Sequence, residues 1–274
     1  MIMVSEVLVA SLIIGGMGGA LGLGLSLASK LFHVEVDKRV SKVREVLPGA
    51  NCGACGFVGC DAFAEAIVDG SAEVNACPVG GQSLTEKLAE IMGVEASSSP
   101  SVVARVLCNG RCSISLEKYN YTGMDDCASA AAIFGGHKAC SYGCLGHGNC
   151  VRACPFNAIS IVDGIARIIE ERCVACGKCL AACPKDLIEF ASKDKNYAVL
   201  CRSKDKGPIT KKNCQVGCIG CRLCMKACPS DAITMDGFLA HIDTQKCTNC
   251  GECEKKCPTK AIRKIDSLIT VYSD

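Results

Sequence analysis

Residues 218–229 read CIGCRLCMKACP and residues 247–258 read CTNCGECEKKCP, so both follow the spacing C-x2-C-x2-C-x3-C-P. In this spacing three cysteines on a tight loop bind three irons of a [4Fe-4S] cluster, and the fourth cysteine ligates the neighbouring cluster. The rule predicts two crossed ligand sets. These are Cys218, Cys221, Cys224 with Cys257, and Cys247, Cys250, Cys253 with Cys228. Two linked redox centres indicate electron transfer.

Zinc is the alternative metal for a chain with 25 cysteines in 274 residues. Structural zinc sites usually pair two C-x2-C knuckles across a longer gap, and the compressed runs do not fit that pattern. Tryptophan is absent and only 12 residues are aromatic, so cysteine-bound metal, rather than large side chains, is expected to hold the chain together. A net charge of +2 excludes a strongly basic nucleic-acid binder.

An internal repeat covers most of the chain. Eight upstream cysteines match eight downstream cysteines at a constant offset of 74 residues. They are Cys140, Cys144, Cys150, Cys154, Cys173, Cys176, Cys179 and Cys183 against Cys214, Cys218, Cys224, Cys228, Cys247, Cys250, Cys253 and Cys257. Val106-Leu107-Cys108 likewise corresponds to Val199-Leu200-Cys201. The first copy is longer by an insertion of 19 residues upstream of Cys140, which carries Cys112 and Cys127.

The first copy departs from the pattern at one position. Cys173, Cys176 and Cys179 with Cys154 form a regular ligand set, but His147 stands where the second copy has Cys221. Either His147 is a ligand or a nearby cysteine replaces it. Because an imidazole ligand changes a cluster's potential greatly and a spare thiolate is at hand, Cys140 is the favoured substitute. The expected set is Cys140, Cys144, Cys150 and Cys183, with His147 an exposed loop residue as the alternative.

A smaller cysteine module precedes the repeats. The segment NCGACGFVGC (51–60) and the later Cys77-Pro78 give the spacing C-x2-C-x4-C-x16-C, which can hold one [4Fe-4S] cluster. Its ligands would be Cys52, Cys55, Cys60 and Cys77. Five cysteines are left, and four of them could hold a sixth cluster or remain buried thiols. These are Cys108, Cys112, Cys127, Cys201 and Cys214. The sequence therefore predicts five to six clusters.

The N-terminal segment decides the compartment. Residues 7–29 contain no charge, and a helix of that length can cross a hydrocarbon core of about 30 Å. Lys30, Lys38 and Arg39 follow it and nothing basic precedes it, which predicts a single-pass membrane protein with its iron–sulfur domains in the cytoplasm. Cytosolic thiols stay reduced, so metal ligation is favoured over disulfides.

These features predict an α+β fold: one transmembrane helix, a small four-cysteine module and two tandem bacterial-ferredoxin-like units of βαβ type. The expected boundaries are a membrane anchor at 1–33, a four-cysteine module at 34–95, a linker at 96–101, a first repeat at 102–192, a basic connector at 193–212 and a second repeat at 213–274. The connector carries seven basic residues against two acidic ones, and it is either a docking surface for an acidic partner or a solvated loop.

The apolar N-terminal segment, NCGACGFVGC with its downstream Cys-Pro, and CSYGCLGHGNCVRACPFNAI (140–159) followed by further CxxCxxCxxxCP runs together resemble the B subunit of the Rnf complex. The resemblance covers essentially the whole chain. It implies an ion-translocating ferredoxin:NAD oxidoreductase complex in a bacterial or archaeal cell membrane. It further implies that this subunit accepts electrons from reduced ferredoxin and passes them to membrane subunits of the complex.

The sequence also limits what the chain itself does. No glycine-rich dinucleotide fingerprint follows an expected strand, so no flavin or NAD is expected to bind to this chain, and electron transfer needs no catalytic acid or base. A second function remains open: an iron–sulfur reductase that delivers electrons to a redox regulator, nitrogenase or a corrinoid protein.

Overall fold

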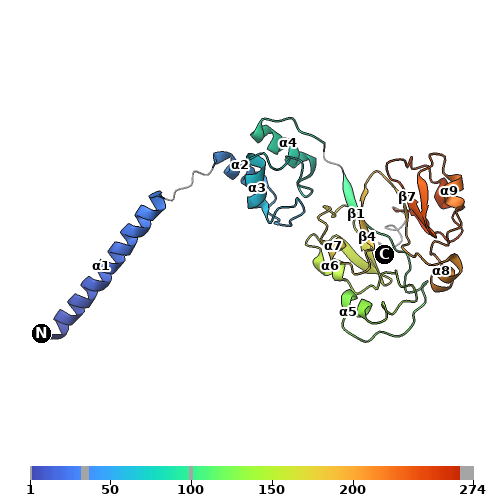
Figure 1. The fold of residues 1–274 in the computed structure, drawn as a ribbon, viewed down its shortest axis with the longest axis horizontal. Coiled ribbons are helices and arrows are strands. Elements are labelled where there is room, and N and C mark those ends of the chain that lie inside the picture. The colour runs from blue at the N-terminus through green and yellow to red at the C-terminus, as the bar shows by residue number, and fades with distance from the viewer. Residues whose placement is uncertain (1, 32–36, 99–100, 266–274) are drawn as a thin grey trace.

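The first element is a long apolar helix. The structure is a computed structural model and describes residues 2–31, 37–98 and 101–265. Helix α1 (Ile2–Leu31) stands apart from the other elements in Figure 1. Its segment Leu12–Leu31 has a mean hydropathy of 1.6 and exposed apolar side chains, and it is long enough to cross a membrane. The expected boundary at 33–34, part of the linker (99–100) and residues 266–274 lie outside the described residues.

Three short helices form the module that follows. They are α2 (Lys38–Val46), α3 (Cys60–Val68) and α4 (Gly81–Met92). The Asp37 side chain caps α2 by accepting from the backbone N–H of Arg39, and Gly93 ends α4 in the left-handed region at φ 68°. The three helices bury one apolar core around Phe63 and Leu88, which also contains Cys77. This core holds the cysteine loop of residues 51–60 in place.

The first repeat consists of antiparallel strand pairs and short helices. Its elements are β1 (Val102–Val106), α5 (Cys127–Ala132), α6 (Asn149–Ala153), β2 (Ile159–Val162), β3 (Ile165–Ile168), α7 (Lys178–Ala181) and β4 (Ile188–Ser192). Strand β1 pairs with β4, and β2 pairs with β3. A two-stranded pair is marginally stable alone, so each pair depends on what packs against it.

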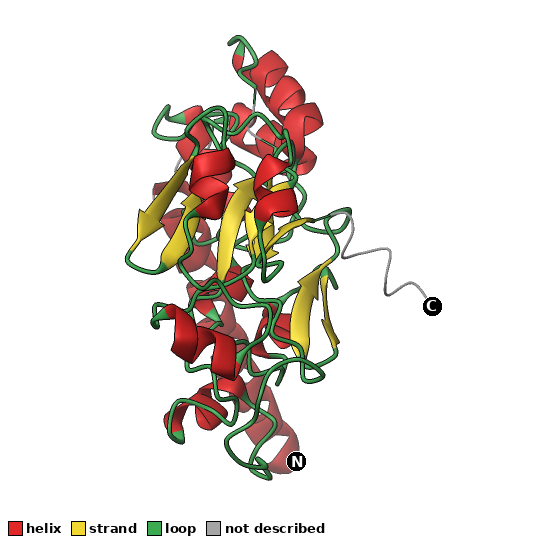
Figure 2. Cartoon of the chain, turned by 90° about the vertical axis from the view of Figure 1, so that its right-hand side faces the viewer, coloured by secondary structure: helices red, strands yellow, loops and turns green. Residues whose placement is uncertain are grey.

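The second repeat has the same order of elements, with helix α8 in the place that α5 takes in the first repeat. Its elements are β5 (Tyr197–Val199), α8 (Gly207–Asn213), α9 (Leu223–Ala227), β6 (Ile233–Asp236), β7 (Leu239–Ile242), α10 (Glu252–Lys256) and β8 (Ile262–Lys264). Strand β5 pairs with β8 and β6 with β7. The basic connector expected at 193–212 thus contains a strand of this repeat's sheet. Figure 2 shows the strands as short pairs between short helices.

Cysteines occupy much of each repeat's core. Cys108, Cys150 and Cys179 are buried with Ile165 and Leu187 in the first repeat, and four further cysteines pack against them. The second repeat buries Cys201, Cys224 and Cys253 with Ile233 and Ile262. Domains of this size with few large apolar side chains usually need additional cross-links, such as bound metal. The fold therefore positions the sulfur atoms inside each repeat.

Candidate iron–sulfur centres

The N-terminal set comprises Cys52, Cys55, Cys60 and Cys77, and the helical module brings these together. Asn51 fastens the loop because its Oδ1 accepts from the backbone N–H of Cys60 at 2.8 Å, where α3 begins. Burial raises the pKa of the Cys77 thiol, and the nearby charges of Cys55 and Cys52 raise it further. The loop and the buried Cys77 thus face one centre.

In the second repeat the structure brings together the cysteines of each expected set. Burial raises the pKa of Cys224 to about 11, with further contributions from the charges of Cys218, Cys221 and Cys257. The other set lines a single pocket and consists of Cys228, Cys247, Cys250 and Cys253. Arg222 and Asn249 have φ of 60°, so each loop contains a residue in the left-handed region beside its second cysteine.

The first repeat contains a regular set of the same kind. Cys154, Cys173, Cys176 and Cys179 line one pocket. Burial raises the pKa of Cys179 to about 11, followed by the charges of Cys173, Cys176 and Cys154. Ala175 occupies the left-handed region at φ 53°, at the position equivalent to Asn249. The same backbone conformation therefore shapes both loops.

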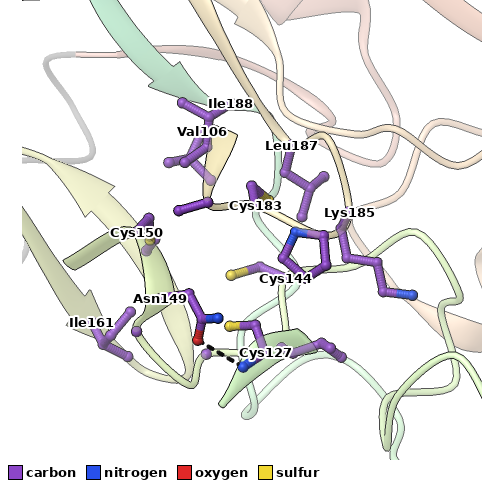
Figure 3. Close-up of a pocket in the computed structure, with 16 residues that line it drawn as sticks. Val106, Cys127, Cys144, Asn149, Cys150, Ile161, Cys183, Lys185, Leu187 and Ile188 are labelled. Atoms are coloured by element: carbon purple, nitrogen blue, oxygen red, sulfur yellow. Dashed lines mark hydrogen bonds between the residues drawn. The ribbon is translucent and has the colours of Figure 1, made fainter. Parts of the chain in front are cut away.

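The second set of the first repeat differs from the sequence expectation. Cys127, Cys144, Cys150 and Cys183 line one pocket, which Figure 3 shows in close-up. Burial raises the pKa of Cys150 to about 12, with Cys144, Cys127 and Cys183 as charged neighbours. Cys140, expected here, lies instead beside Cys108 and Cys214. We call the four cysteines of this pocket the inserted set, because Cys127 comes from the insertion.

Local contacts explain why Cys127 reaches this pocket. Cys127 is the first residue of α5, which the Asp126 side chain caps. Asn149, at the start of α6, accepts from the backbone N–H of Cys127 at 2.8 Å and donates to Asp126 at 2.7 Å. These bonds hold the insertion against the cysteine loop. A signal for this was available: the copy that lacks one cysteine also carries an insertion with unmatched cysteines.

His147 does not line the pocket of the inserted set. Its Nδ1 lies 2.8 Å from a carboxylate oxygen of Asp125, and its ring meets Tyr121 edge-on at 5.1 Å between centroids. The side chain is 16% exposed, so it is neither a fully exposed loop residue nor a residue lining the cysteine pocket.

The remaining cysteines separate into a group of four and a single residue. Burial raises the pKa of Cys140 to about 11, ahead of the charges of Cys108 and Cys214. Burial also raises the pKa of Cys201 to about 12, and Cys140 is among its charged neighbours. We call Cys108, Cys140, Cys201 and Cys214 the junction set. Cys112 is exposed and belongs to no set.

The sets fit a cluster better than a single ion. Among the described residues, no three His, Cys, Asp or Glu side chains converge closely enough to hold one metal ion. A zinc site needs all its sulfurs about 2.3 Å from one centre, whereas a [4Fe-4S] cluster spreads its thiolates over four irons. Backbone N–H groups also point at the sulfurs: Ala158 donates to Cys154 and Ala232 to Cys228, each at 3.4 Å. Such donors stabilise a negatively charged cluster.

Parts of the chain match three iron–sulfur families. Residues 47–79 match a family described as an Fe-S cluster family, residues 146–194 an LdpA Fe-S cluster-binding domain, and residues 217–261 a 4Fe-4S dicluster domain. Together the matches support iron–sulfur clusters in the module and in both repeats.

Similar proteins cover most of the chain. The B subunit of the Na(+)-translocating ferredoxin:NAD(+) oxidoreductase complex of Acetobacterium woodii is 47% identical over 89% of this chain and 74% of that protein. The B subunit of the ion-translocating oxidoreductase complex of Methanosarcina acetivorans is 44% identical over 89% of this chain and 93% of that protein. The B subunit of the proton-translocating ferredoxin:NAD(+) oxidoreductase complex of Clostridium ljungdahlii is 45% identical over 82% of this chain and 80% of that protein.

Proposed function

The chain belongs to the family of B subunits of ion-translocating oxidoreductase complexes, and from this we propose that it transfers electrons from reduced ferredoxin within a ferredoxin:NAD oxidoreductase complex. The observation that carries the proposal is the series of four-cysteine sets along one chain that includes a candidate membrane helix. The subunit is part of an oxidoreductase, and its own contribution is to conduct electrons.

The residues of this chain bind and insulate the clusters. When bound, [4Fe-4S] clusters supply reversible one-electron oxidation and reduction. The cysteine thiolates hold them in two tandem ferredoxin-like units and an N-terminal module, with five or six clusters in all. Buried side chains such as Ile165 and Ile262 keep water from the clusters, and the N–H donors at the sulfurs favour their charge. No proton transfer is required.

The proposed point at which electrons enter is the second repeat, which has both an exposed candidate ligand and exposed basic side chains. Cys221 is exposed at the surface of the second repeat. Helix α8, which ends one residue before Cys214, carries Lys211 and Lys212 in its last turn, and both are exposed. An acidic donor such as ferredoxin needs a local positive surface, because cluster loading makes this subunit negatively charged as well.

Two other basic residues of the expected connector contact the rest of the fold. Lys195 donates to the carbonyl oxygen of Cys247 at 2.7 Å, and Arg202 pairs with Glu189 at 2.9 Å. These two cations are therefore engaged inside the protein, and we assign docking to the lysines Lys204, Lys206, Lys211 and Lys212. Lys204 forms a surface ion pair with Asp236 at 3.5 Å.

We further propose that α1 anchors the subunit as a single span, with the cluster domains on the cytoplasmic side. A single helix without ionisable groups between residues 7 and 29 offers no path for an ion. The translocation path therefore belongs to other membrane subunits of the complex, to which this chain delivers electrons.

The test is to purify the complex anaerobically with and without this subunit and to assay NAD reduction by reduced ferredoxin. We expect the reaction to require this subunit. Electron transfer from the isolated subunit to a redox regulator, nitrogenase or a corrinoid protein, with no ferredoxin-dependent NAD reduction by the complex, would instead support the reductase function.

A further inference from the structure

The junction set consists of two pairs of equivalent positions from the two repeats. Cys108 and Cys201 follow the equivalent strands β1 and β5 in the matching segments Val-Leu-Cys. Cys140 and Cys214 are equivalent at the repeat offset of 74 residues. Each repeat therefore supplies the same two thiols, and neither repeat contains all four.

Backbone contacts between the repeats bring the four segments together. The N–H of Asn109 donates to the carbonyl of Leu200 at 3.2 Å, and the N–H of Leu116 donates to the carbonyl of Asn213 at 3.1 Å. At Gly110, an added Cβ would lie 3.3 Å from Sγ of Cys214 and 3.7 Å from Sγ of Cys108. A side chain at residue 110 would crowd the sulfur of Cys214, so glycine suits this close approach.

Backbone N–H groups donate to every sulfur of the set. Cys108 accepts from the N–H of Cys144 at 3.5 Å, and Cys201 accepts from the N–H of Ser203 at 3.4 Å. The N–H of Tyr142 donates to Cys140. The N–H groups of Val216 and Gly217 donate to Cys214. Neutral thiols are weak acceptors, so this number of donors suits sulfurs that carry charge, as cluster ligands do.

A buried lysine beside the set supports the same conclusion. Lys138 is only 1% exposed, and its Nζ donates to the carbonyl oxygens of Gly110 at 2.9 Å and Gly164 at 3.0 Å. Within the described part of the chain it forms no ion pair with a carboxylate. A buried ammonium group is costly without a nearby negative charge, and its charge acts on Cys214 and on Cys144 of the inserted set. Negatively charged clusters on these cysteines would compensate it.

We propose that Cys108, Cys140, Cys201 and Cys214 hold a sixth [4Fe-4S] cluster at the junction of the two repeats. This inference rests on the proposed electron-transfer function: bound by these four thiols, the cluster would supply one-electron oxidation and reduction between the two repeats. Four thiols lose four protons when it binds. The cluster also cross-links the repeats, since its ligands come in pairs from each.

The test counts iron and sulfide in the full chain produced anaerobically. We expect about 24 irons in the wild type and about 20 in Cys108→Ser or in Cys201→Ser, because either change breaks the same site. The double variant Cys108→Ser/Cys201→Ser should also retain about 20, since one cluster cannot be lost twice. The matched control is Cys112→Ser, which should keep about 24 and the full spectrum of reduced clusters in electron paramagnetic resonance.

Retention of about 20 irons shows that the variants still fold around the other clusters. The proposal is overturned if the wild type holds only about 20 irons, or if the single variants keep the wild-type number. It is also overturned if the double variant loses about eight irons, since two sites would then be involved. The iron count does not depend on NAD reduction. If the complex proves not to reduce NAD, the count still tests the junction site. If the junction site holds no cluster, ferredoxin-dependent NAD reduction still tests the proposed function.

Discussion

Lys138 is a buried residue whose charge acts on two sulfur sites. It is fully buried, and its charge acts on Cys144 of the inserted set and on Cys214 of the junction set. A positive charge favours the reduced form of a nearby cluster, because reduction adds a negative charge. Clusters bound by these cysteines would therefore be easier to reduce with Lys138 beside them.

Replacing Lys138 by methionine should lower the midpoint potential of the clusters beside it. The equilibrium constant for reduction is expected to fall roughly tenfold, which corresponds to about 59 mV for one electron. Redox titration followed by electron paramagnetic resonance measures it. Lys212→Met, at an exposed position, is the control and should leave all potentials in place. An unchanged titration for Lys138→Met would show that its charge does not act on the clusters.

A second residue prediction separates Cys127 from His147. Cys127→Ser should remove about four irons, because it takes a thiolate from the inserted set. His147→Ala should keep the full number, because His147 faces Asp125 rather than the pocket. Iron and sulfide analysis of both variants decides the matter. Loss of iron in the histidine variant alone would reinstate the imidazole as a ligand.

Cysteine spacing predicts which thiols lie together best where only a few residues separate them. The C-x2-C-x2-C loops span a few residues, so sequence alone groups Cys218, Cys221 and Cys224 as the structure does. Spacing could not choose between Cys127 and Cys140, since that choice depends on how an insertion folds back through Asp126 and Asn149. The family resemblance, drawn from motifs along the whole chain, is confirmed.

At the level of elements, the repeat extends to backbone conformation. Asn157, Ala175 and Asp186 have positive φ, and so do their equivalents Asp231, Asn249 and Lys260. Left-handed non-glycine residues cost on the order of 1–3 kcal/mol each and persist where surrounding contacts fix them. The sequence repeat predicted matching elements. It did not predict strand β5, which lies inside the expected connector and pairs with β8, because three residues are too few for a strand pattern.

Helix α3 is the element on which the N-terminal set depends. Phe63 is 1% exposed, and its ring lies 5.5 Å from that of Phe57 in the cysteine loop. Phe63→Ala should lower the free energy of unfolding of the module by about 3–5 kcal/mol and release its cluster before the others. Thermal unfolding followed by absorbance of the clusters measures this. Val58→Ala, at a side chain 96% exposed, should change it by less than about 0.5 kcal/mol.

At the scale of the whole molecule, surface charge governs encounter with the donor. Replacing Lys204, Lys206, Lys211 and Lys212 by glutamate should slow electron transfer from reduced ferredoxin and leave the iron content intact. The wild-type rate should fall as salt rises, because exposed charges are screened over about 8–10 Å, while the variant should be slow and nearly independent of salt. Stopped-flow reduction at several salt concentrations measures both.

The matched control for docking reverses four exposed lysines elsewhere, namely Lys38, Lys42, Lys87 and Lys256. This control changes the net charge by the same amount as the docking variant. A difference between the two variants would therefore come from where the charges lie. Equal slowing in both variants would mean that ferredoxin responds to overall charge, and an unchanged rate in the first would move the docking site to the surface around Cys52 and Cys55.

The division of the junction set between the repeats also imposes an order on synthesis. The cysteines of the N-terminal module and of both sets of the first repeat have all been translated once Cys183 is made, but the junction set still lacks Cys201 and Cys214. Ribosomes add about 5–20 residues per second, so Cys140 waits roughly 4–15 s for its counterpart 74 residues later. A nascent chain stalled in that interval carries only two of the four thiols, so a junction cluster would form only after both repeats have been made.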